Sequence, residues 1–402
     1  MANRTNVQGR FGAWSTALLL AGIALAAMLL LWMRTRAGLG RLPSDPGYDY
    51  FIAATERGWS SIWSPDPFPQ VISRVVAWIA VQFPFELHAV IAGALTNVLW
   101  ATLAAVAGYI VWQQWRSILL SVMTGLFLIL NPVARESALL NHGNLKWPLL
   151  SVTVLAISSP TFFRSHIPIT ATLLAFTALS QPLVFVAVVP IGIVALLDRN
   201  RSVRAVSIAL LITTVGILFQ VAVTGIDRST SGHGASRILR PWPGMGVFWW
   251  FGLAAPPIVA VAAIVISLRR AISGREEELQ VVALSASAIA LAVSSYRLGG
   301  IADRYFVAPM FIAYVSALIV MANMWRSKGS WWKASVAVGV LVLLLPCFRW
   351  FPASSWLTSG PLWSDEATRA TDVCENGDVA VIAMGVTPTG TTEVPCDLIR
   401  ND

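Results

Sequence analysis

Two carboxylates, Asp45 and Asp49, follow directly on an apolar run in the stretch RLPSDPGYDYF (41–51). A carboxylate that is flanked by aromatic rings and partly removed from water can act as a general base. Four-residue spacing would place both acids on one helix face, but an intervening Pro-Gly pair favours a turn. The alternative is a structural role, in which the acids keep the loop soluble or cap a helix that begins near Tyr48.

A second polar stretch, NPVARESALLNHGNLKWPLL (131–150), contains more hydrogen-bonding groups than a simple connector requires. Its histidine can donate to a phosphate, bind a metal ion or act as a base. The alternative is a solvated loop that Trp147 anchors at a membrane surface. The candidate binding residues of this stretch are Asn141, His142, Asn144 and Lys146.

Arginine residues gather in two further stretches, GIDRSTSGHGASRILRPWPGMG (225–246) and SSYRLGGIADRYFVAP (294–309). Guanidinium groups match phosphate oxygens in geometry and charge, so these stretches could hold a phosphate or a diphosphate. The alternative is a set of arginines that extend to the membrane surface, with the acid of the second stretch compensating its neighbour. The candidates are Arg237, Arg240, Arg297, Asp303, Arg304 and Tyr305, together with Arg74 nearer the N-terminus.

The elements that must position these residues are membrane helices. The chain has 402 residues, of which 56% are hydrophobic and 12% are charged, whereas a soluble domain is about 25% charged. Apolar runs long enough for membrane helices recur along the whole length. The net charge of +8 comes largely from arginines between these runs, so membrane topology explains it and no nucleic-acid partner is expected.

Eleven apolar ranges are predicted to span the membrane in an all-α integral membrane protein. The first is too long for a cleaved signal peptide and is expected to remain as a span. A break at ALSQPL (178–183) leaves open whether 167–197 forms two short crossings or one kinked helix. The predicted spans are 13–33, 87–112, 117–132, 147–159, 167–180, 182–197, 205–224, 247–268, 278–296, 306–324 and 334–348.

Basic residues concentrate in short loops that eleven crossings place on the side of the N-terminus. The positive-inside rule therefore predicts a cytoplasmic N-terminus and an extracytoplasmic C-terminus, although Arg34 and Arg41 then lie outside. Residues 1–348 form the predicted transmembrane domain, whose first outer loop (34–86) carries an interfacial helix. The tryptophans of that helix, which favour the lipid headgroup region, are Trp59, Trp63 and Trp78.

The extracytoplasmic tail, residues 349–402, contains Cys374 and Cys396 on either side of a predicted strand (378–384) and a Thr/Gly/Pro turn region. Two cysteines outside the cell are expected to form a disulfide. A tail of this size has little core of its own, so a covalent link would stabilise a small α/β unit.

Nucleotide-binding glycine loops, metalloprotease motifs and serine-hydrolase motifs are absent from the sequence. The inner loops are too short to hold a nucleotide-binding domain. Any donor substrate is therefore expected to arrive in the outer leaflet rather than as a cytosolic nucleotide.

The outline resembles the GT-C glycosyltransferases, in particular bacterial members of that family. The matching pieces are SDPGYDYF after the first span, PDPFPQVISR ending at Arg74, and NHGNLKW (141–147) before a middle span. The resemblance implies a multi-pass protein of the bacterial plasma (inner) membrane that moves a sugar from a polyprenyl-phosphate donor to an acceptor glycan or protein on the outer face.

In that resemblance, Asp45, or otherwise Asp49, takes the proton of the acceptor hydroxyl, while arginines and His142 bind the lipid phosphate. Membrane lipids and the lipid-linked sugar are the implied partners. A divalent cation between acid and phosphate is compatible with the family, but no residue pattern requires one, so the cofactor and metal requirements are unknown.

Two other functions fit the same composition. A lipid or small-solute transporter would carry broken helices in paired repeats, whereas only ALSQPL shows such a break. A non-catalytic scaffold for envelope assembly would use the stapled tail as its binding surface.

Overall fold

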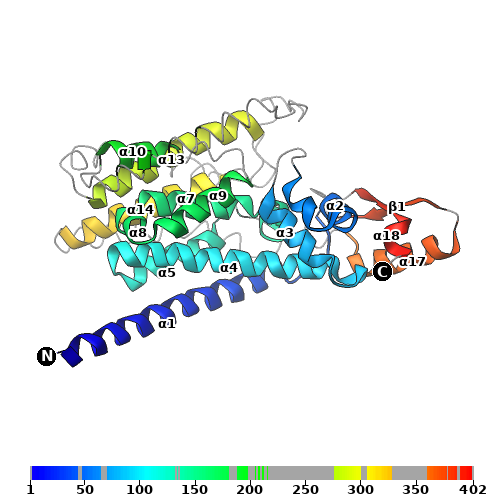
Figure 1. Cartoon of the computed structure of the whole chain (residues 1–402), viewed down its shortest axis with the longest axis horizontal. Coiled ribbons are helices and arrows are strands. Elements are labelled where there is room, and N and C mark those ends of the chain that lie inside the picture. The colour runs from blue at the N-terminus through cyan, green and yellow to red at the C-terminus, as the bar shows by residue number, and fades with distance from the viewer. Residues whose placement is uncertain are drawn as a thin grey trace, which may run out of the picture.

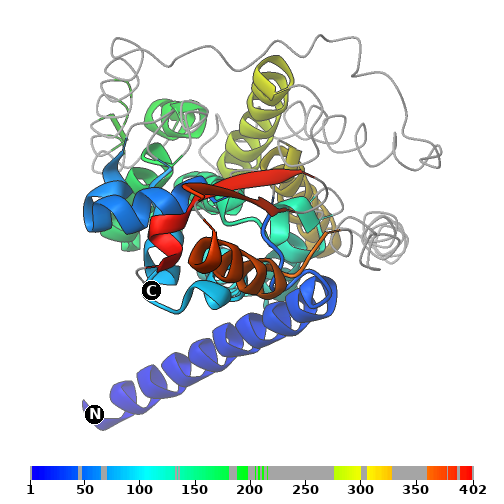
Figure 2. The ribbon, with the colours of Figure 1, turned by 90° about the vertical axis from the view of Figure 1, so that its right-hand side faces the viewer.

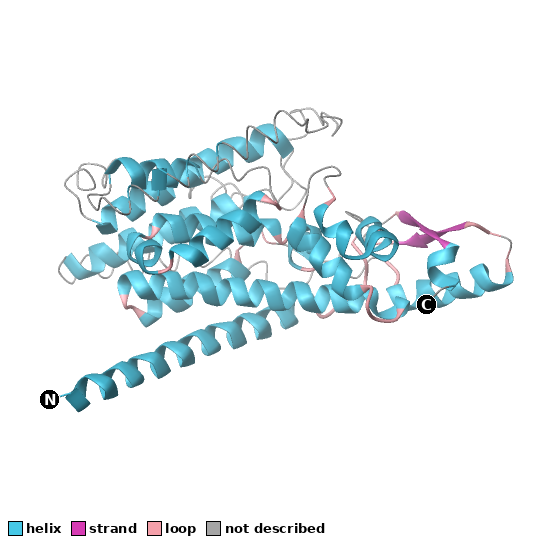
Figure 3. Cartoon of the chain, in the orientation of Figure 1, coloured by secondary structure: helices cyan, strands magenta, loops and turns pink. Residues whose placement is uncertain are grey.

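The computed structural model is mostly helical, and among the residues it describes the strands lie only in the C-terminal tail (Figure 3). This agrees with the predicted all-α class and the small α/β tail. The described residues are 2–43, 48–64, 70–131, 134, 136–180, 188–197, 276–299, 306–327, 360–377, 379–386 and 390–400, with isolated positions between 204 and 215.

The described helices fall into two sets along the chain. The first set is α1 (Ala2–Thr35), α2 (Asp49–Arg57), the 3-10 helix η1 (Gly58–Trp63), α3 (Val71–Ala80), η2 (Phe85–Leu87), α4 (His88–Trp115) and α5 (Ile118–Leu130). The second set is α6 (Glu136–Leu139), η3 (His142–Asn144), α7 (Lys146–Ser158), α8 (Pro160–Ser165), α9 (Ile167–Ala178), α10 (Val188–Leu197), α13 (Glu276–Gly299) and α14 (Val307–Ser327).

Helices occupy the described parts of eight predicted spans, and the other three (205–224, 247–268 and 334–348) lie outside the described residues apart from isolated positions. Two of the described helices are long and apolar enough to cross a membrane, Trp14–Thr35 and Phe85–Trp115. The predicted break at ALSQPL is confirmed to the extent that α9 ends at Ala178. The crossing count of eleven stays a prediction.

The helices run roughly along one axis, and the N-terminus and C-terminus lie at opposite ends of it (Figure 1). Helix α4 packs beside α5, α7 and α1. The first-loop elements α2 and α3 lie at the same end as the tail, which faces the viewer in Figure 2. This end brings together the segments that carry the candidate site.

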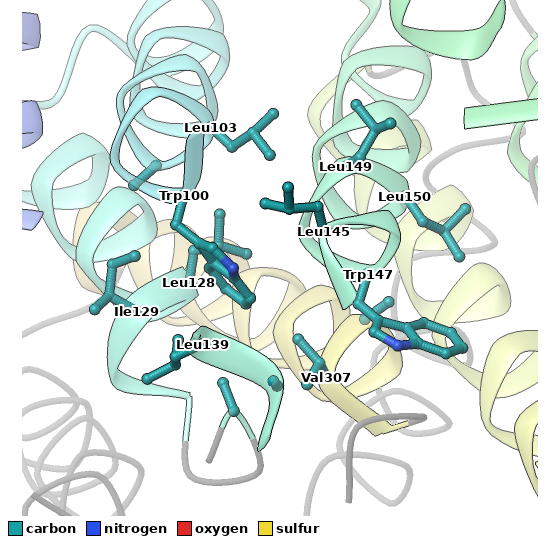
Figure 4. Close-up of a cluster of buried hydrophobic side chains, with 14 of the residues drawn as sticks. Trp100, Leu103, Leu128, Ile129, Leu139, Leu145, Trp147, Leu149, Leu150 and Val307 are labelled. Carbon is teal, nitrogen blue, oxygen red and sulfur yellow. The ribbon is translucent and has the colours of Figure 1, made fainter. Parts of the chain in front are cut away.

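The core between α4, α5, α7 and α14 is built from large side chains that are fully buried. Trp100 of α4 and Trp147 of α7 approach it from two sides, with Leu145 and Val307 between them (Figure 4). Such all-round burial fits α7, whose residues from Trp147 to Ser158 are all buried. Helix α7 is therefore the central helix, and it fixes the position of the turn that precedes it.

Two arginines that the charge pattern places on the outer side donate hydrogen bonds to backbone carbonyl oxygens of other segments. Arg34, at the end of α1, is buried and donates to the carbonyl oxygens of Ile129 and Ala134, at and beyond the end of α5. A cation stabilises the carbonyls that a helix C-terminus leaves without partners. Arg41 similarly donates to the carbonyl oxygen of Gly360 at 2.9 Å, which ties the first loop to the tail.

Two glycines allow α4 and α5 to approach closely. A Cβ atom on Gly125 would lie 2.7 Å from the carbonyl oxygen of Ala104 and 2.6 Å from a methyl carbon of Ile23. Gly108 has the reciprocal position, 2.9 Å from the carbonyl oxygen of Ser121. Small residues at such positions are typical of helix pairs in membranes.

We predict that Gly125→Ala lowers the free energy of unfolding by about 1–3 kcal/mol, the usual cost of overpacking a tight interface. The matched control is Gly22→Ala in α1, where a Cβ atom would meet nothing within 4 Å. Alanine is the better helix former by roughly 0.5–1 kcal/mol, so this control should unfold at the same or a slightly higher temperature. Thermal unfolding in detergent measures both, and equal effects of the two substitutions would contradict the packing.

The tail consists of α17 (Trp363–Asn376), an antiparallel pair β1 (Val381–Gly385) and β2 (Thr391–Pro395), and α18 (Cys396–Arg400). The predicted disulfide between Cys374 and Cys396 is present and joins α17 to α18. The predicted strand begins three residues later than expected. The prediction of a turn region after this strand was partly wrong. Thr391–Pro395 alternates exposed and buried residues and forms the second strand.

An ion pair on the tail surface fastens α17 to the edge of β1. Glu366 accepts from the backbone N–H of Gly385 at 2.7 Å and from Arg369 at 2.7 Å, and Arg369 also donates to the carbonyl oxygen of Ala383. The Arg369 side chain and then the Gly385 amide lower the pKa of Glu366 against an opposing effect of partial burial. The ionised carboxylate therefore stabilises the folded tail.

We predict that the tail loses stability as the pH falls, and that Glu366→Gln removes much of this dependence. A carboxyl whose pKa is lowered by folding contributes its stability above the pKa of the unfolded state and loses it as the pH falls through the pKa of the folded state. Hydrogen exchange of the Gly385 amide between neutral and acidic pH measures the effect. Glu375→Gln, an exposed substitution on the same helix, should leave the pH dependence unchanged.

Candidate functional site

Helix α2 presents one buried face to the protein and leaves its first residue in solvent. Tyr50, Phe51 and Ala54 are buried, whereas Asp49 is exposed in the first turn. An acid in the first turn interacts favourably with the helix dipole, and the N-cap residue of α2 is Tyr48 rather than Asp49. The structure therefore places Asp49 at the rim of the site and Tyr50 inside it.

Arg74 of α3 lies almost entirely inside the protein, with 4% of its surface exposed. Its guanidinium carbon lies 4.8 Å from the centre of the Tyr50 ring, which is a cation–π contact. One of its terminal nitrogens donates to the carbonyl oxygen of Ser61 at 3.2 Å. These contacts join α2, η1 and α3 into one unit around a buried positive charge.

The turn around His142 packs directly against this unit. Asn141 shapes the turn, because its side-chain oxygen accepts from the backbone N–H of Gly143 at 2.8 Å. Ser73, the neighbour of Arg74, donates its hydroxyl to the carbonyl oxygen of His142 at 2.9 Å. The His142 ring, 1% exposed, meets the Tyr50 ring edge-on with centroids 5.9 Å apart.

Lys146 begins α7 and extends toward the first loop. Its ammonium nitrogen lies 3.5 Å from the side-chain oxygen of Gln70, the residue before α3, and 5.9 Å from the centre of the Trp147 ring. The side-chain oxygen of Asn144 accepts from the Trp147 indole at 3.3 Å. Asn144 thus positions the start of the central helix.

We define Tyr50, Arg74, His142 and Lys146 as the basic cluster. It combines two positive side chains with an imidazole and an aromatic wall, and Arg74 and His142 are nearly excluded from water. Electrostatic attraction in such surroundings is stronger than in bulk solvent. The cluster is therefore suited to hold an anion with oxygen acceptors, such as a phosphate.

The described structure tests only part of the predicted site. It brings together the segments of Arg74, Asn141, His142 and Lys146. Asp49 directly precedes Tyr50, the aromatic residue of the cluster, in α2. Helix α13 contains Arg297, whose side chain is not described. The predicted residues that lie outside the described part are Asp45, Arg237, Arg240, Asp303, Arg304 and Tyr305.

The sequence did not predict a cluster of buried rings at the start of α2, in which Tyr48 contacts His88 and Trp363. The Tyr48 hydroxyl lies 2.7 Å from Nδ1 of His88, whose Nε2 lies 2.9 Å from the carbonyl oxygen of Phe83. A carbonyl oxygen can only accept, so Nε2 carries a proton and, in the neutral ring, Nδ1 accepts from Tyr48. This arrangement fixes the residue that precedes Asp49.

The tail completes this cluster of buried rings. The ring of Trp363 stacks on the ring of Tyr48 with centroids 4.9 Å apart, and its indole donates to the carbonyl oxygen of Phe85 at 2.8 Å. Thr392 of β2 accepts from the backbone N–H of Tyr48 at 3.3 Å. The tail thereby holds the stretch on which the predicted carboxylates lie.

The sequence contained a signal for helix α17, which carries Trp363. Trp363, Ala367, Ala370 and Cys374 recur at helical spacing in an otherwise polar segment, and all four are buried. Such a pattern predicts an amphipathic helix but does not reveal its partner, which is 278 residues away in the case of Phe85.

The side chains of the basic cluster do not include a preformed metal site among the described residues. Within the described ranges, no group of three or more His, Cys, Asp or Glu side chains could hold a metal ion. A cavity of about 270 Å³ is lined by residues 81–86, at the turn between α3 and α4.

Comparisons with protein-family models, with curated proteins and with solved structures found no match for this chain. Its function is therefore inferred from the residues and their arrangement.

Proposed function

We propose that this protein is an integral-membrane glycosyltransferase that moves a sugar from a polyprenyl-phosphate donor to an acceptor at the outer face of the membrane. The observation that carries the proposal is the basic cluster, in which Arg74 and His142 both contact the ring of Tyr50, and Lys146 contacts Gln70, which precedes the helix of Arg74. Two of the three pieces that carry the sequence resemblance to the GT-C family, PDPFPQVISR and NHGNLKW, contain Arg74, His142 and Lys146. The GT-C-like arrangement of about eleven spans belongs to the proposal.

The disulfide supports the orientation in this proposal. Disulfides persist in oxidising compartments, which for a plasma membrane means the extracytoplasmic side. The bridge between Cys374 and Cys396 lies in the tail, and the tail contacts the first loop through Trp363. The basic cluster then faces outward, and the N-terminus, at the other end of the long axis, is cytoplasmic (Figure 1).

The proposed reaction exchanges one bond at the anomeric carbon of the sugar. The acceptor hydroxyl oxygen forms a bond to that carbon as a carboxylate, Asp45 or otherwise Asp49, takes the hydroxyl proton. The bond between the anomeric carbon and the phosphate oxygen breaks, and the lipid phosphate leaves with the electron pair. Arg74 and Lys146 stabilise the negative charge that develops on the phosphate.

We predict that Asp45→Asn lowers sugar transfer by about 100-fold or more, since loss of a general base costs on the order of 10²–10⁴ in rate. Profiles of lipid-linked glycans and their products in cells that carry each variant measure the transfer, and the level of protein in the membrane is measured in parallel. Asp49→Asn is the matched control and should retain most activity. Full activity of Asp45→Asn would reject Asp45 as the base, and loss in Asp49→Asn alone would assign the role to Asp49.

We predict that Arg74→Gln weakens binding of a polyprenyl phosphate by about 10- to 100-fold, the effect of losing hydrogen bonds to a charged group. Arg57→Gln, an exposed substitution at the end of α2, is the matched control and should bind normally. Binding to purified protein in detergent is measured by titration with the lipid, and thermal unfolding checks that both variants are folded. Equal affinity of a folded Arg74→Gln variant and the wild type would contradict a phosphate site at the cluster.

A further inference from the structure

Three tryptophans from separate parts of the first loop form one group on the protein surface. Trp59 lies edge-on to Trp63 with ring centroids 6.5 Å apart, and edge-on to Trp78 of α3 at 5.1 Å. Trp59 is 56% exposed and Trp63 is 52% exposed, so both indoles are available to a surface outside the protein. We call Trp59, Trp63 and Trp78 the tryptophan triad.

The triad lies at the level where apolar helices of the bundle end. The backbone N–H of Val71, the first residue of α3, donates to the carbonyl oxygen of Leu179 at 3.1 Å. The next amide, of Ile72, donates to the side chain of Ser180 at 3.3 Å. Both acceptors directly follow α9, whose Phe176 is itself 42% exposed. The start of helix α3 is thus fixed to the end of an apolar helix that has an exposed aromatic side chain.

The same turn that exposes the triad also holds the basic cluster. Arg74 donates to the carbonyl oxygen of Ser61, which lies between Trp59 and Trp63 in η1. The residues from Gly58 to Trp63 carry no charge. The indoles are therefore presented on an uncharged outer surface while a guanidinium is bound to its inner side.

We propose that the tryptophan triad docks into the lipid headgroup region of the bilayer and sets the depth of the first loop. Indole rings favour this region because they combine a large apolar surface with one hydrogen-bond donor. A bilayer fits these observations better than a protein partner, because the triad is joined to the end of an apolar helix. If the proposed function also holds, a lipid phosphate diffusing in the outer leaflet reaches Arg74 without leaving the membrane.

The test places a fluorescent thiol label on a cysteine introduced by Ser60→Cys, between Trp59 and Trp63 in the sequence. Cys347, the third cysteine of the chain, is first replaced by serine so that the label reacts only at the introduced site. Two reference labels are used: Leu25→Cys on the exposed side of α1 for the apolar interior, and Thr368→Cys on the exposed side of α17 for water. The full-length protein is reconstituted into phosphatidylcholine vesicles that contain a lipid with a nitroxide on its headgroup. Iodide in the buffer serves as the soluble quencher.

We expect the headgroup nitroxide to quench the Ser60 label several-fold more strongly than the Thr368 label, and iodide to show the opposite order. Replacing Trp59 and Trp63 together by serine should reduce the headgroup quenching several-fold. Replacing Trp14, which is exposed on α1, by serine should leave the headgroup quenching of the Ser60 label unchanged. Thermal unfolding confirms that the variants are folded.

Two results would overturn the proposal. A Ser60 label that is as accessible to iodide as the Thr368 label would place the triad in water. A Ser60 label shielded from both quenchers would show that protein covers the triad. Neither result bears on sugar transfer, because no donor lipid is present, so a failure here is distinct from a failure of the proposed function.

Discussion

The candidate site depends on the contact between helix α3 and the turn around His142. The Ser73 hydroxyl binds the His142 carbonyl oxygen, and the adjacent Arg74 lies over Tyr50. These contacts join segments that are separated by 69 residues in the chain. Without them the positive side chains of the first loop and of the stretch before α7 would not share the surface that we propose to bind a phosphate.

Burying this much polarity requires compensation, and the structure shows two ways in which cations obtain it. Arg34 is bound by carbonyl oxygens at and beyond the end of a helix, so its charge is used to stabilise the fold. Arg74 lies against the ring of Tyr50, which the His142 ring also contacts, and it donates to the carbonyl oxygen of Ser61. Arg34 therefore has a structural role, whereas the contacts of Arg74 join the segments that carry the proposed binding site.

Local signals in the sequence were sufficient for the helical class, for the helices in the described parts of the predicted spans and for the disulfide, because apolar runs and cysteine spacing report directly on them. They also indicated His142 and Lys146 from the density of polar residues. They could not reveal His88 or Trp363 as partners of Tyr48, because those contacts arise only when distant segments pack together. Nor could they reveal that Trp147, considered as a membrane-surface anchor, is fully buried and donates to Asn144.

The most direct test of the account is a cross-linking measurement between α3 and the start of α7. Cysteines replace Gln70 and Lys146, whose side chains lie 3.5 Å apart, in a Cys347→Ser background, and a short bifunctional thiol reagent is added to membranes. The account predicts efficient cross-linking of this pair and little cross-linking when Gln82, exposed just beyond α3, replaces Gln70 as the cysteine site. Equal cross-linking of both pairs, or none at positions 70 and 146 in folded protein, would show that the two segments do not meet.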